Sequence, residues 1–380
     1  MNYIRRMLSV FRSFGFSSPF VMRAFFVVCL TCLSHFSMAQ DGVRGGLHFG
    51  AMIAHRNEIR NLNKAHLYGA ELNLFWNTKG IKQWQKLYSY PQLGVDFLWV
   101  NMNNEDQLGQ QFSLSPYIDL PLQWRPKKIN QWLKLGFGLG YANTVWDLET
   151  NVKALVIGSH FNAAISMQYA AEVKISQSVF LRPGIRITHF SNASFKLPNL
   201  GTNNFTLFLA ASFERGVRMR IIENKIEKDD FIPISTKKWS QIVSYNIGFR
   251  ENFPPGGPKH AVHTLRYRIS KTPKRKSSWG AFVEGTYNRS LEALLYEGSP
   301  IAKGDLFQSG IGGVYGLHFG RTHFDFMTGV YLINAYSQRG PVFNRFGIQH
   351  EFTAHFRAQM MLKTHYSKAD HFALGVAYQL

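Results

Sequence analysis

The chain has 380 residues, of which 15% are aromatic, and its 43 Lys and Arg against 23 Asp and Glu give a net charge of +20. This length allows two ordinary domains or one large barrel. The basic residues are spread along the chain without zinc-finger spacing or a basic helix, which argues against a nucleic-acid partner and favours an anionic membrane surface.

Residues 1–39 are predicted to be a secretory signal peptide. Four arginines give a positive n-region, no acidic residue precedes Asp41, and a Ser-Met-Ala cleavage sequence ends at Ala39. The apolar core at 24–33 is too short to cross a bilayer as a helix, so we expect cleavage near Ala39. Removing the four leader arginines from the 43 Lys and Arg leaves 39 against 23 acidic residues, so the mature chain stays basic.

Both cysteines, Cys29 and Cys32, lie in this leader. Neither follows the small residue that lipoprotein processing requires, so a plain signal peptide is the better interpretation. The mature chain therefore has no disulfide. For a long exported chain this points to a bacterial envelope protein.

After the leader, the sequence predicts strands. Segments that are mostly about 9 to 15 residues long alternate between apolar and polar positions and are separated by Gly, Pro, Asn, Asp and Lys clusters. Eight are expected before a charged connector at 215–238 and eight after it. The expected ranges are 43–55, 66–77, 90–102, 110–124, 132–146, 155–173, 178–191, 204–214, 239–250, 260–271, 278–290, 306–319, 321–334, 343–356, 357–367 and 371–380.

Long, aromatic-rich strands of this kind predict an all-β fold, an antiparallel transmembrane β-barrel of about 16 strands in two related sets of eight. The last segment supports this, because its aromatic and aliphatic residues share one face: Phe372, Leu374, Val376, Tyr378 and Leu380. It resembles the C-terminal targeting strand of outer-membrane proteins, although those usually end in Phe. A soluble sandwich or lipocalin-like barrel is the alternative, but it would not need an apolar face on nearly every long strand.

The two sets of eight strands are predicted to be an internal duplication, with halves at 40–214 and 239–380. In each half a His-aromatic-Ser strand leads into an amphipathic last strand. The pattern permits one barrel of about 16 strands or two tandem eight-stranded barrels. We favour the single barrel, because neighbouring halves lose their free edges by pairing with each other as readily as by closing on themselves.

The candidate site is the His189-Phe190-Ser191 sequence near the end of the segment 178–191. Odd positions in this segment are mostly apolar and even positions include the arginines, so His189 and Ser191 should share the lipid-facing side. Residues two apart on a strand lie about 6.6 Å apart at Cα, within reach of an imidazole–hydroxyl contact. A hydroxyl next to a base is the minimum for acyl transfer, and at the lipid face it would meet lipid esters.

The corresponding pair in the second half, His365 and Ser367, falls with Arg357, Gln359 and Lys363. It is therefore expected to face the lumen, in a polar network and not a catalytic site.

The stretch from His189 to Gly201 resembles the active-site region of the lipid A 3-O-deacylases, the PagL-type outer-membrane barrels. The shared pattern is His-aromatic-Ser-Asn-Ala followed by Pro-Asn-x-Gly, here starting at His189 and at Pro198. The second half lies outside the basic family architecture and is similar to longer relatives described as acyloxyacyl hydrolases.

The resemblance implies that Ser191 is the nucleophile and His189 the general base, with Asn192 and Asn199 supporting the oxyanion. In the family an acidic residue completes the triad fourteen positions after the histidine, and here that position is Asn203. An amide can orient the imidazole and fix its tautomer but supplies no charge to stabilise imidazolium.

The leading hypothesis is therefore an outer-membrane serine esterase that removes an acyl chain from lipid A or a related glycolipid of the lipopolysaccharide outer leaflet. No cofactor or metal is expected, since the spaced histidine pairs have no matching carboxylate or thiol set. The alternative is a non-catalytic porin or transport barrel that retains a degenerate motif. A third hypothesis, an assembly or surface-attachment barrel, has no specific support in the sequence.

Overall fold

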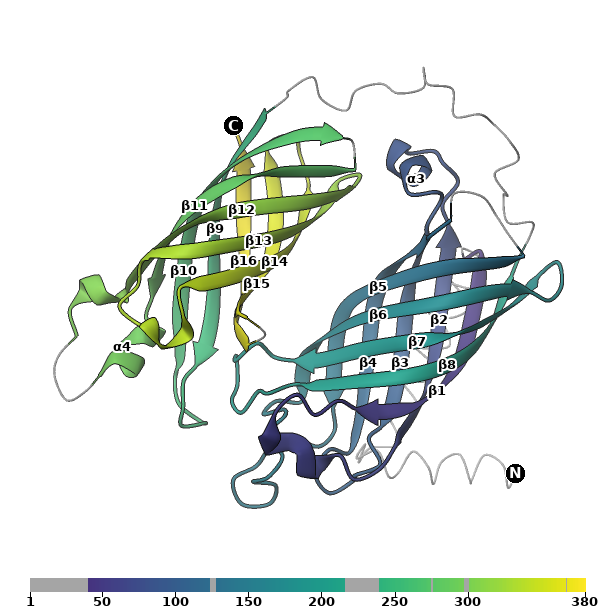
Figure 1. The fold of residues 1–380 in the computed structure, drawn as a ribbon, viewed down its shortest axis with the longest axis horizontal. Coiled ribbons are helices and arrows are strands. Elements are labelled where there is room, and N and C mark those ends of the chain that lie inside the picture. The colour runs from purple at the N-terminus through teal and green to yellow at the C-terminus, as the bar shows by residue number, and fades with distance from the viewer. Residues whose placement is uncertain (1–39, 124–127, 216–238, 275, 297–300, 367) are drawn as a thin grey trace, which may run out of the picture.

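Two closed antiparallel β-barrels make up the computed structural model, which describes residues 40–123, 128–215, 239–274, 276–296, 301–366 and 368–380 (Figure 1). The predicted signal peptide, nearly all of the charged connector, and Ser367 lie outside the described residues. We call the first barrel, strands β1 to β8, barrel one and the second, strands β9 to β16, barrel two.

The strands of barrel one are β1 Gly42–Met52, β2 Leu67–Asn77, β3 Gln92–Asn101, β4 Gln110–Pro121, β5 Ile129–Ala142, β6 Phe161–Lys174, β7 Val179–Ser191 and β8 Thr202–Glu214. The strands of barrel two are β9 Trp239–Glu251, β10 Lys259–Lys274, β11 Ser277–Asn288, β12 Phe307–Phe319, β13 Thr322–Ile333, β14 Val342–Glu351, β15 Phe356–His365 and β16 Lys368–Gln379. Short helical turns interrupt the loops: η1 Asn57–Leu62, α3 Gln83–Leu87, α4 Ser290–Leu295, η3 Lys303–Leu306 and η4 Ser337–Arg339. Within the described ranges, no helix combines the length and the apolar character needed to cross a membrane.

The predicted fold class is confirmed, with sixteen strands in two sets of eight. The preference for one continuous barrel was wrong, and the tandem alternative holds. β1 pairs along its whole length with β8, from Gly42 opposite Glu214 to Met52 opposite Asn204, and β16 pairs back onto β9. Each half thus removes its own free edges by closure, which leaves no edge for the other half to pair with.

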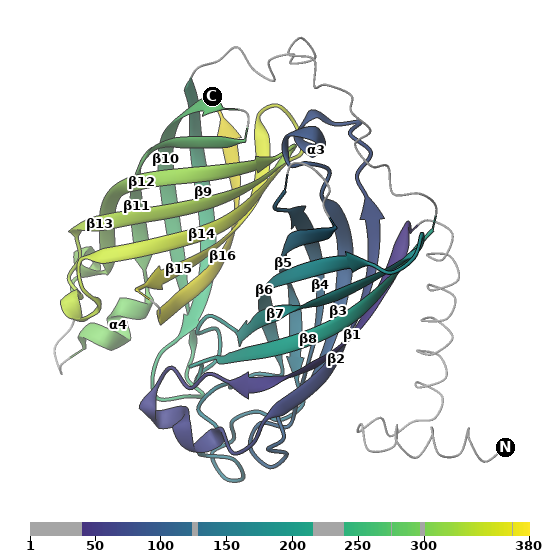
Figure 2. The same ribbon diagram turned by 45° about the vertical axis from the view of Figure 1, so that its right-hand side comes forward.

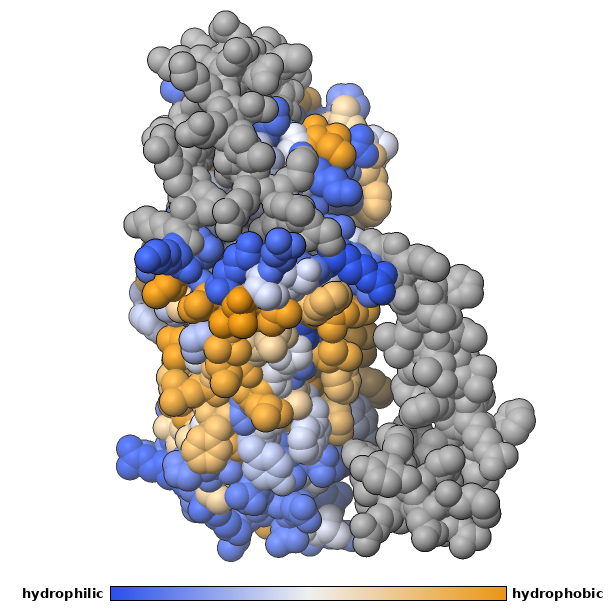
Figure 3. All heavy atoms as spheres, turned by 90° about the vertical axis from the view of Figure 1, so that its right-hand side faces the viewer, coloured by the Kyte–Doolittle hydropathy of each residue, from blue (hydrophilic) through white to orange (hydrophobic). Residues whose placement is uncertain are grey.

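Side chains alternate across the barrel walls as the period-2 pattern predicts. In β1, Arg44 and His48 are buried inside, whereas the outward Leu47 is 72% exposed. Figure 3 shows the result on barrel one, an apolar band between hydrophilic ends. An outward apolar belt of this kind is the surface that a membrane-spanning barrel presents to lipid.

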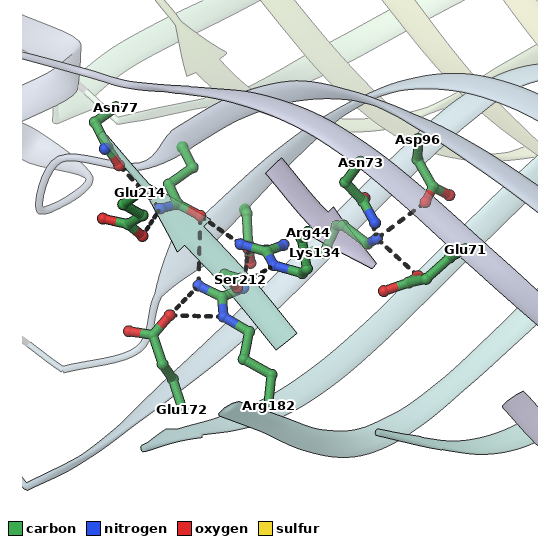
Figure 4. A network of polar contacts seen from close by, with 12 residues as sticks. Arg44, Glu71, Asn73, Asn77, Asp96, Lys134, Glu172, Arg182, Ser212 and Glu214 are labelled. Carbon is green, nitrogen blue, oxygen red and sulfur yellow. Dashed lines mark hydrogen bonds and ion pairs between the residues drawn. The ribbon is translucent and has the colours of Figure 1, made fainter. Parts of the chain in front are cut away.

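The lumen of barrel one is filled by ion pairs and hydrogen bonds between residues of different strands (Figure 4). Arg186 contacts Glu71 at 2.8 Å and Asp96 at 2.6 Å, and Lys134 lies 3.3 Å from the same two carboxylates. A second cluster joins Arg44 and Arg182 to Asp119, Glu172, Gln92 and Ser212. Eight strands enclose an interior just wide enough to be filled by side chains, and this polar packing fills it.

The two barrels lie side by side (Figures 1 and 2) and contact each other at both ends. At the end that carries α3, the Tyr88 ring stacks on the Phe319 ring with 4.3 Å between the ring centroids, and the Tyr88 hydroxyl donates to the Lys276 carbonyl. At the opposite end, the Glu251 N–H donates to the Ser194 carbonyl at 2.8 Å. The loop between β7 and β8, which follows the predicted nucleophile, therefore lies against barrel two.

Candidate active site

His189 lies on the outer face of β7, as predicted. The even positions Arg182 and Arg186 are buried in the lumen, whereas Ile185 and Ile187 on the outer side are 41% and 37% exposed. His189 continues the outward series near the end of the strand. Phe190, between His189 and Ser191, points inward and is fully buried, which anchors this part of the strand.

Asn203 lies directly opposite His189 on the neighbouring strand β8. Its Oδ1 is 2.6 Å from Nδ1 of the imidazole. The amide therefore occupies the place where a triad's acidic residue would orient the ring, behind the nitrogen that faces away from a substrate.

Ser191 ends β7, and its hydroxyl contacts the loop that follows. Asn199 Nδ2 lies 2.8 Å from Ser191 Oγ, and the Ala193 N–H donates to the same oxygen at 3.1 Å. Among the residues that the structure describes, Ser191 Oγ makes its hydrogen bonds with this loop and not with His189. Hydrogen bonds between catalytic groups often tighten only when substrate is bound.

Asn192 and Asn199 hold the loop in different ways. The Asn192 side chain donates within the loop to the Lys196 carbonyl at 2.9 Å, and it donates to Ser159 Oγ, in the loop between β5 and β6, at 2.7 Å. The Asn199 carboxamide instead faces Ser191, and its Oδ1 also accepts the Asn192 N–H at 3.0 Å. Of the two amides predicted to support an oxyanion, Asn199 thus has its side-chain donor beside the nucleophile.

Gly201 packs against the imidazole of His189. Its φ of 77° is in the left-handed region that favours glycine. A Cβ at this position would lie 2.7 Å from Cε1 of the imidazole and 3.3 Å from Nε2. The last residue of the Pro-Asn-x-Gly sequence therefore meets two requirements, the turn before β8 and room for the ring.

Sequence reasoning missed His55, which lies in the loop between β1 and β2. Its Nδ1 is 2.9 Å from Asn203 Nδ2, and its Nε2 is 3.1 Å from the Leu200 carbonyl oxygen. The available signal was parity, because the outward series of β1 continues through Ile53 to His55. This parity indicates a role for His55 at the site only once β1 and β8 are known to be neighbouring strands.

A hydrophobic cluster at this end of barrel one fixes the loops around the site. It joins Phe190 of β7 to residues of the surrounding strands and loops. Its members are Met52, Ile59, Leu62, Leu67, Leu98, Val100, Met102, Leu108, Ala142, Val156, Ile157, Ala164 and Phe190. Ile59 and Leu62 belong to η1, in the same loop as His55, so this packing holds His55 close to β8.

In the second half, the predicted inward orientation of His365 is confirmed. Its side chain is buried in barrel two, where Nε2 lies 2.8 Å from the hydroxyl of Tyr331. The structure thus gives the two histidines different surroundings, one on the outer wall of barrel one and the other in the lumen of barrel two. The proposed internal duplication stays a prediction.

Known solved structures resemble the chain only remotely. Neisserial surface protein A is 11% identical, with 46% of this chain and 96% of that chain covered and a TM-score of 0.32. The outer-membrane enzyme PagL is 18% identical, with 44% of this chain and 97% of that chain covered and a TM-score of 0.32. A Rhodopseudomonas blastica porin mutant is 8% identical, with 89% of this chain and 99% of that chain covered and a TM-score of 0.18. Scores this low carry no conclusion about function. A search of curated proteins found no match.

Family models match both halves of the chain. Residues 69–212 match the lipid A 3-O-deacylase (PagL) family, and residues 239–380 match the C-terminal domain of acyloxyacyl hydrolases. Together with the barrel fold, these matches indicate a deacylase of the outer membrane. Residues 69–212 therefore form a domain of the lipid A 3-O-deacylase (PagL) family, and residues 239–380 form the C-terminal domain found in acyloxyacyl hydrolases.

Proposed function

We propose that this protein is a serine esterase that removes an ester-linked acyl chain from lipid A, or from a related glycolipid of the lipopolysaccharide leaflet. Ser191 is the nucleophile, His189 the general base and Asn203 the residue that orients the base. The observation that carries the proposal is the outward position of His189, at the end of the lipid-facing series of β7, with Asn203 Oδ1 at 2.6 Å from its Nδ1.

The reaction begins with attack of Ser191 Oγ on the acyl carbonyl carbon, while the hydroxyl proton passes to Nε2 of His189. This step requires the hydroxyl to turn from Asn199 toward the imidazole. The oxyanion that forms is stabilised by Asn199 Nδ2 and by backbone N–H groups after Ser191, since donors placed where negative charge develops lower the barrier. The bond between the acyl carbon and the sugar oxygen then breaks, and the sugar oxygen takes the proton from Nε2 of His189. Water hydrolyses the acyl-enzyme by the same sequence of proton transfers.

The position of the site suits a membrane substrate. His189 follows Ile185 and Ile187 on the outer wall, so an acyl chain lying along this wall would bring its ester to the end of β7. The net positive charge of the chain favours binding to the phosphates of an anionic glycolipid.

A porin function has less support. The lumen of barrel one contains bridging ion pairs such as those of Arg186 with Glu71 and Asp96. Barrels of eight strands generally have interiors filled by side chains, whereas aqueous channels belong to barrels with about 16 strands or more.

The proposed function predicts a mass change in lipid A. Cells that express the wild-type protein should contain lipid A lighter by one acyl group, whereas cells that express Ser191→Ala should contain the intact lipid. Mass spectrometry of lipid A, with equal amounts of folded protein verified by heat-dependent gel mobility, measures this directly. Identical lipid A from both strains would refute the proposal.

A further inference from the structure

His55 is placed to determine which nitrogen of His189 carries the proton. Its Nε2 lies 3.1 Å from the Leu200 carbonyl oxygen, which can only accept a hydrogen bond. The neutral ring must therefore carry its proton on Nε2. The other nitrogen, Nδ1, is then a lone-pair acceptor.

This lone pair orients the Asn203 amide. His55 Nδ1 accepts from Asn203 Nδ2 at 2.9 Å, so the amide nitrogen faces His55 and the amide oxygen faces His189. Because the oxygen can only accept, Nδ1 of His189 must be the protonated nitrogen. Nε2 of His189 is left with the lone pair that a general base needs.

An amide at this position needs such support, whereas a carboxylate would not. Both oxygens of an aspartate accept, so either one fixes the same imidazole tautomer. An asparagine can rotate by half a turn and present its nitrogen to His189, which would put the imidazole proton on Nε2 and remove the base. The substitution of an amide for an acid therefore makes a second acceptor necessary.

We propose that His55 is a positioning residue that fixes the active tautomer of His189 through Asn203. The Leu200 carbonyl, which can only accept, fixes the direction of this series of hydrogen bonds. The proposal rests on the esterase function for its kinetic consequence. Its structural content, the tautomer of His189, can be measured independently of activity.

The kinetic test is a double-mutant cycle in the full-length protein in detergent micelles. His55→Leu is expected to lower kcat by about threefold to tenfold with little change in KM, the loss that one neutral hydrogen bond accounts for. In an Asn203→Asp background the same substitution should cost less than about twofold, because a carboxylate cannot present a donor. His55→Asn, which keeps an acceptor near the position of Nδ1, should recover most of the loss. An equal cost in both backgrounds would overturn the proposal.

The second test reads the tautomer itself. Nitrogen NMR of protein labelled at histidine should show His189 as a single form protonated at Nδ1, with the signal assigned by its loss in His189→Gln. In His55→Leu the same signal should shift toward a mixture of the two tautomers. An unchanged signal would overturn the role of His55, whereas an absence of lipid cleavage by the wild type would overturn the esterase function alone.

A separate observation gives barrel two a part in the same site. Glu251 ends β9 and is fully buried where the two barrels meet. Its backbone N–H donates to the Ser194 carbonyl at 2.8 Å, and its carboxylate accepts the Leu197 N–H at 3.1 Å. Lys259 of barrel two contacts the same carboxylate at 2.6 Å and holds it in place.

The segment held in this way needs external support. Ala193 and Ser194, two and three residues after the nucleophile, have φ values of 51° and 62°. Non-glycine residues rarely adopt this left-handed conformation, and they keep it only where surrounding contacts impose it. The Ala193 N–H is also one of the two loop donors to Ser191 Oγ, so the conformation of this turn helps to set the position of the nucleophile.

We infer that barrel two serves as a clamp that positions the nucleophile loop, with Glu251 as the contact residue. This inference also rests on the esterase function, but loop protection can be measured without activity. Glu251→Ala in the full chain should lower kcat by about tenfold, more than it changes KM, because positioning errors affect the chemical step. Glu251→Gln, which keeps an acceptor for the Leu197 N–H, should restore most of kcat.

The matched control is Glu292→Ala, at an exposed glutamate of α4 in barrel two. Hydrogen exchange followed by mass spectrometry should show faster exchange of the loop at 192–201 in Glu251→Ala than in Glu292→Ala or the wild type. Unchanged exchange in this loop, or a Gln variant as slow as the Ala variant, would overturn the clamp. If the loop loosens while the wild type cleaves no lipid, only the esterase function is refuted.

Discussion

Replacing His189 with glutamine is expected to lower kcat/KM for acyl-chain release by about 10³-fold, within the range that a positioned general base contributes. Glutamine has no lone pair that can take up the Ser191 proton at neutral pH. It is close to histidine in size and polarity, so the outer wall of β7 should be little disturbed. Product release from purified lipid A in micelles, quantified by mass spectrometry, measures the loss.

The second part of this prediction concerns the double variant. Ser191 and His189 act in one step, so His189→Gln combined with Ser191→Ala should be no slower than the slower single variant. Losses that multiplied would mean that the two residues contribute independently, and would contradict a nucleophile–base pair. His365→Gln is the matched control, because that histidine faces the lumen of barrel two and contacts Tyr331. It should leave the rate of acyl release close to that of the wild type.

Much of the fold could be predicted because strand periodicity is a local property. Alternation in the segment 178–191 was enough to place His189 outside and Arg186 inside, and both positions are confirmed. The same alternation carries no information on which strand closes against which. One barrel of sixteen strands and two barrels of eight bury the same faces, so the sequence pattern fits both arrangements.

The site shows the same limit. The residues from Ser191 to Gly201 could be predicted because they form one contiguous motif that resembles the lipid A deacylases. His55 was missed because it reaches Asn203 only through the pairing of β1 with β8, which follows from closure of barrel one. Glu251 was missed for a similar reason, since nothing local to β9 indicates a contact with the loop after β7. Contacts that depend on closure or on the neighbouring barrel cannot be inferred from alternation alone.

The lumen network leads to the largest expected effect on stability. Arg186 is 1% exposed and bridges Glu71 and Asp96 at 2.8 and 2.6 Å. Replacing it with methionine keeps much of the volume but leaves the carboxylates of Glu71 and Asp96 buried, with Lys134 near both and His48 3.4 Å from Glu71 as their remaining basic contacts among the described residues. Removing one partner of a buried ion pair costs about 3–5 kcal/mol, so Arg186→Met should lower the free energy of unfolding by about that amount.

Urea unfolding in micelles, followed by tryptophan fluorescence, measures this loss. Arg60→Met is the matched control, because Arg60 is exposed in η1 and its removal should change stability by less than about 0.5 kcal/mol. Adding Asp96→Asn to Arg186→Met removes one of the stranded charges and should recover part of the stability, since the penalty comes from uncompensated charge and not from lost volume. A double variant as unstable as the sum of its two single variants would show that packing dominates.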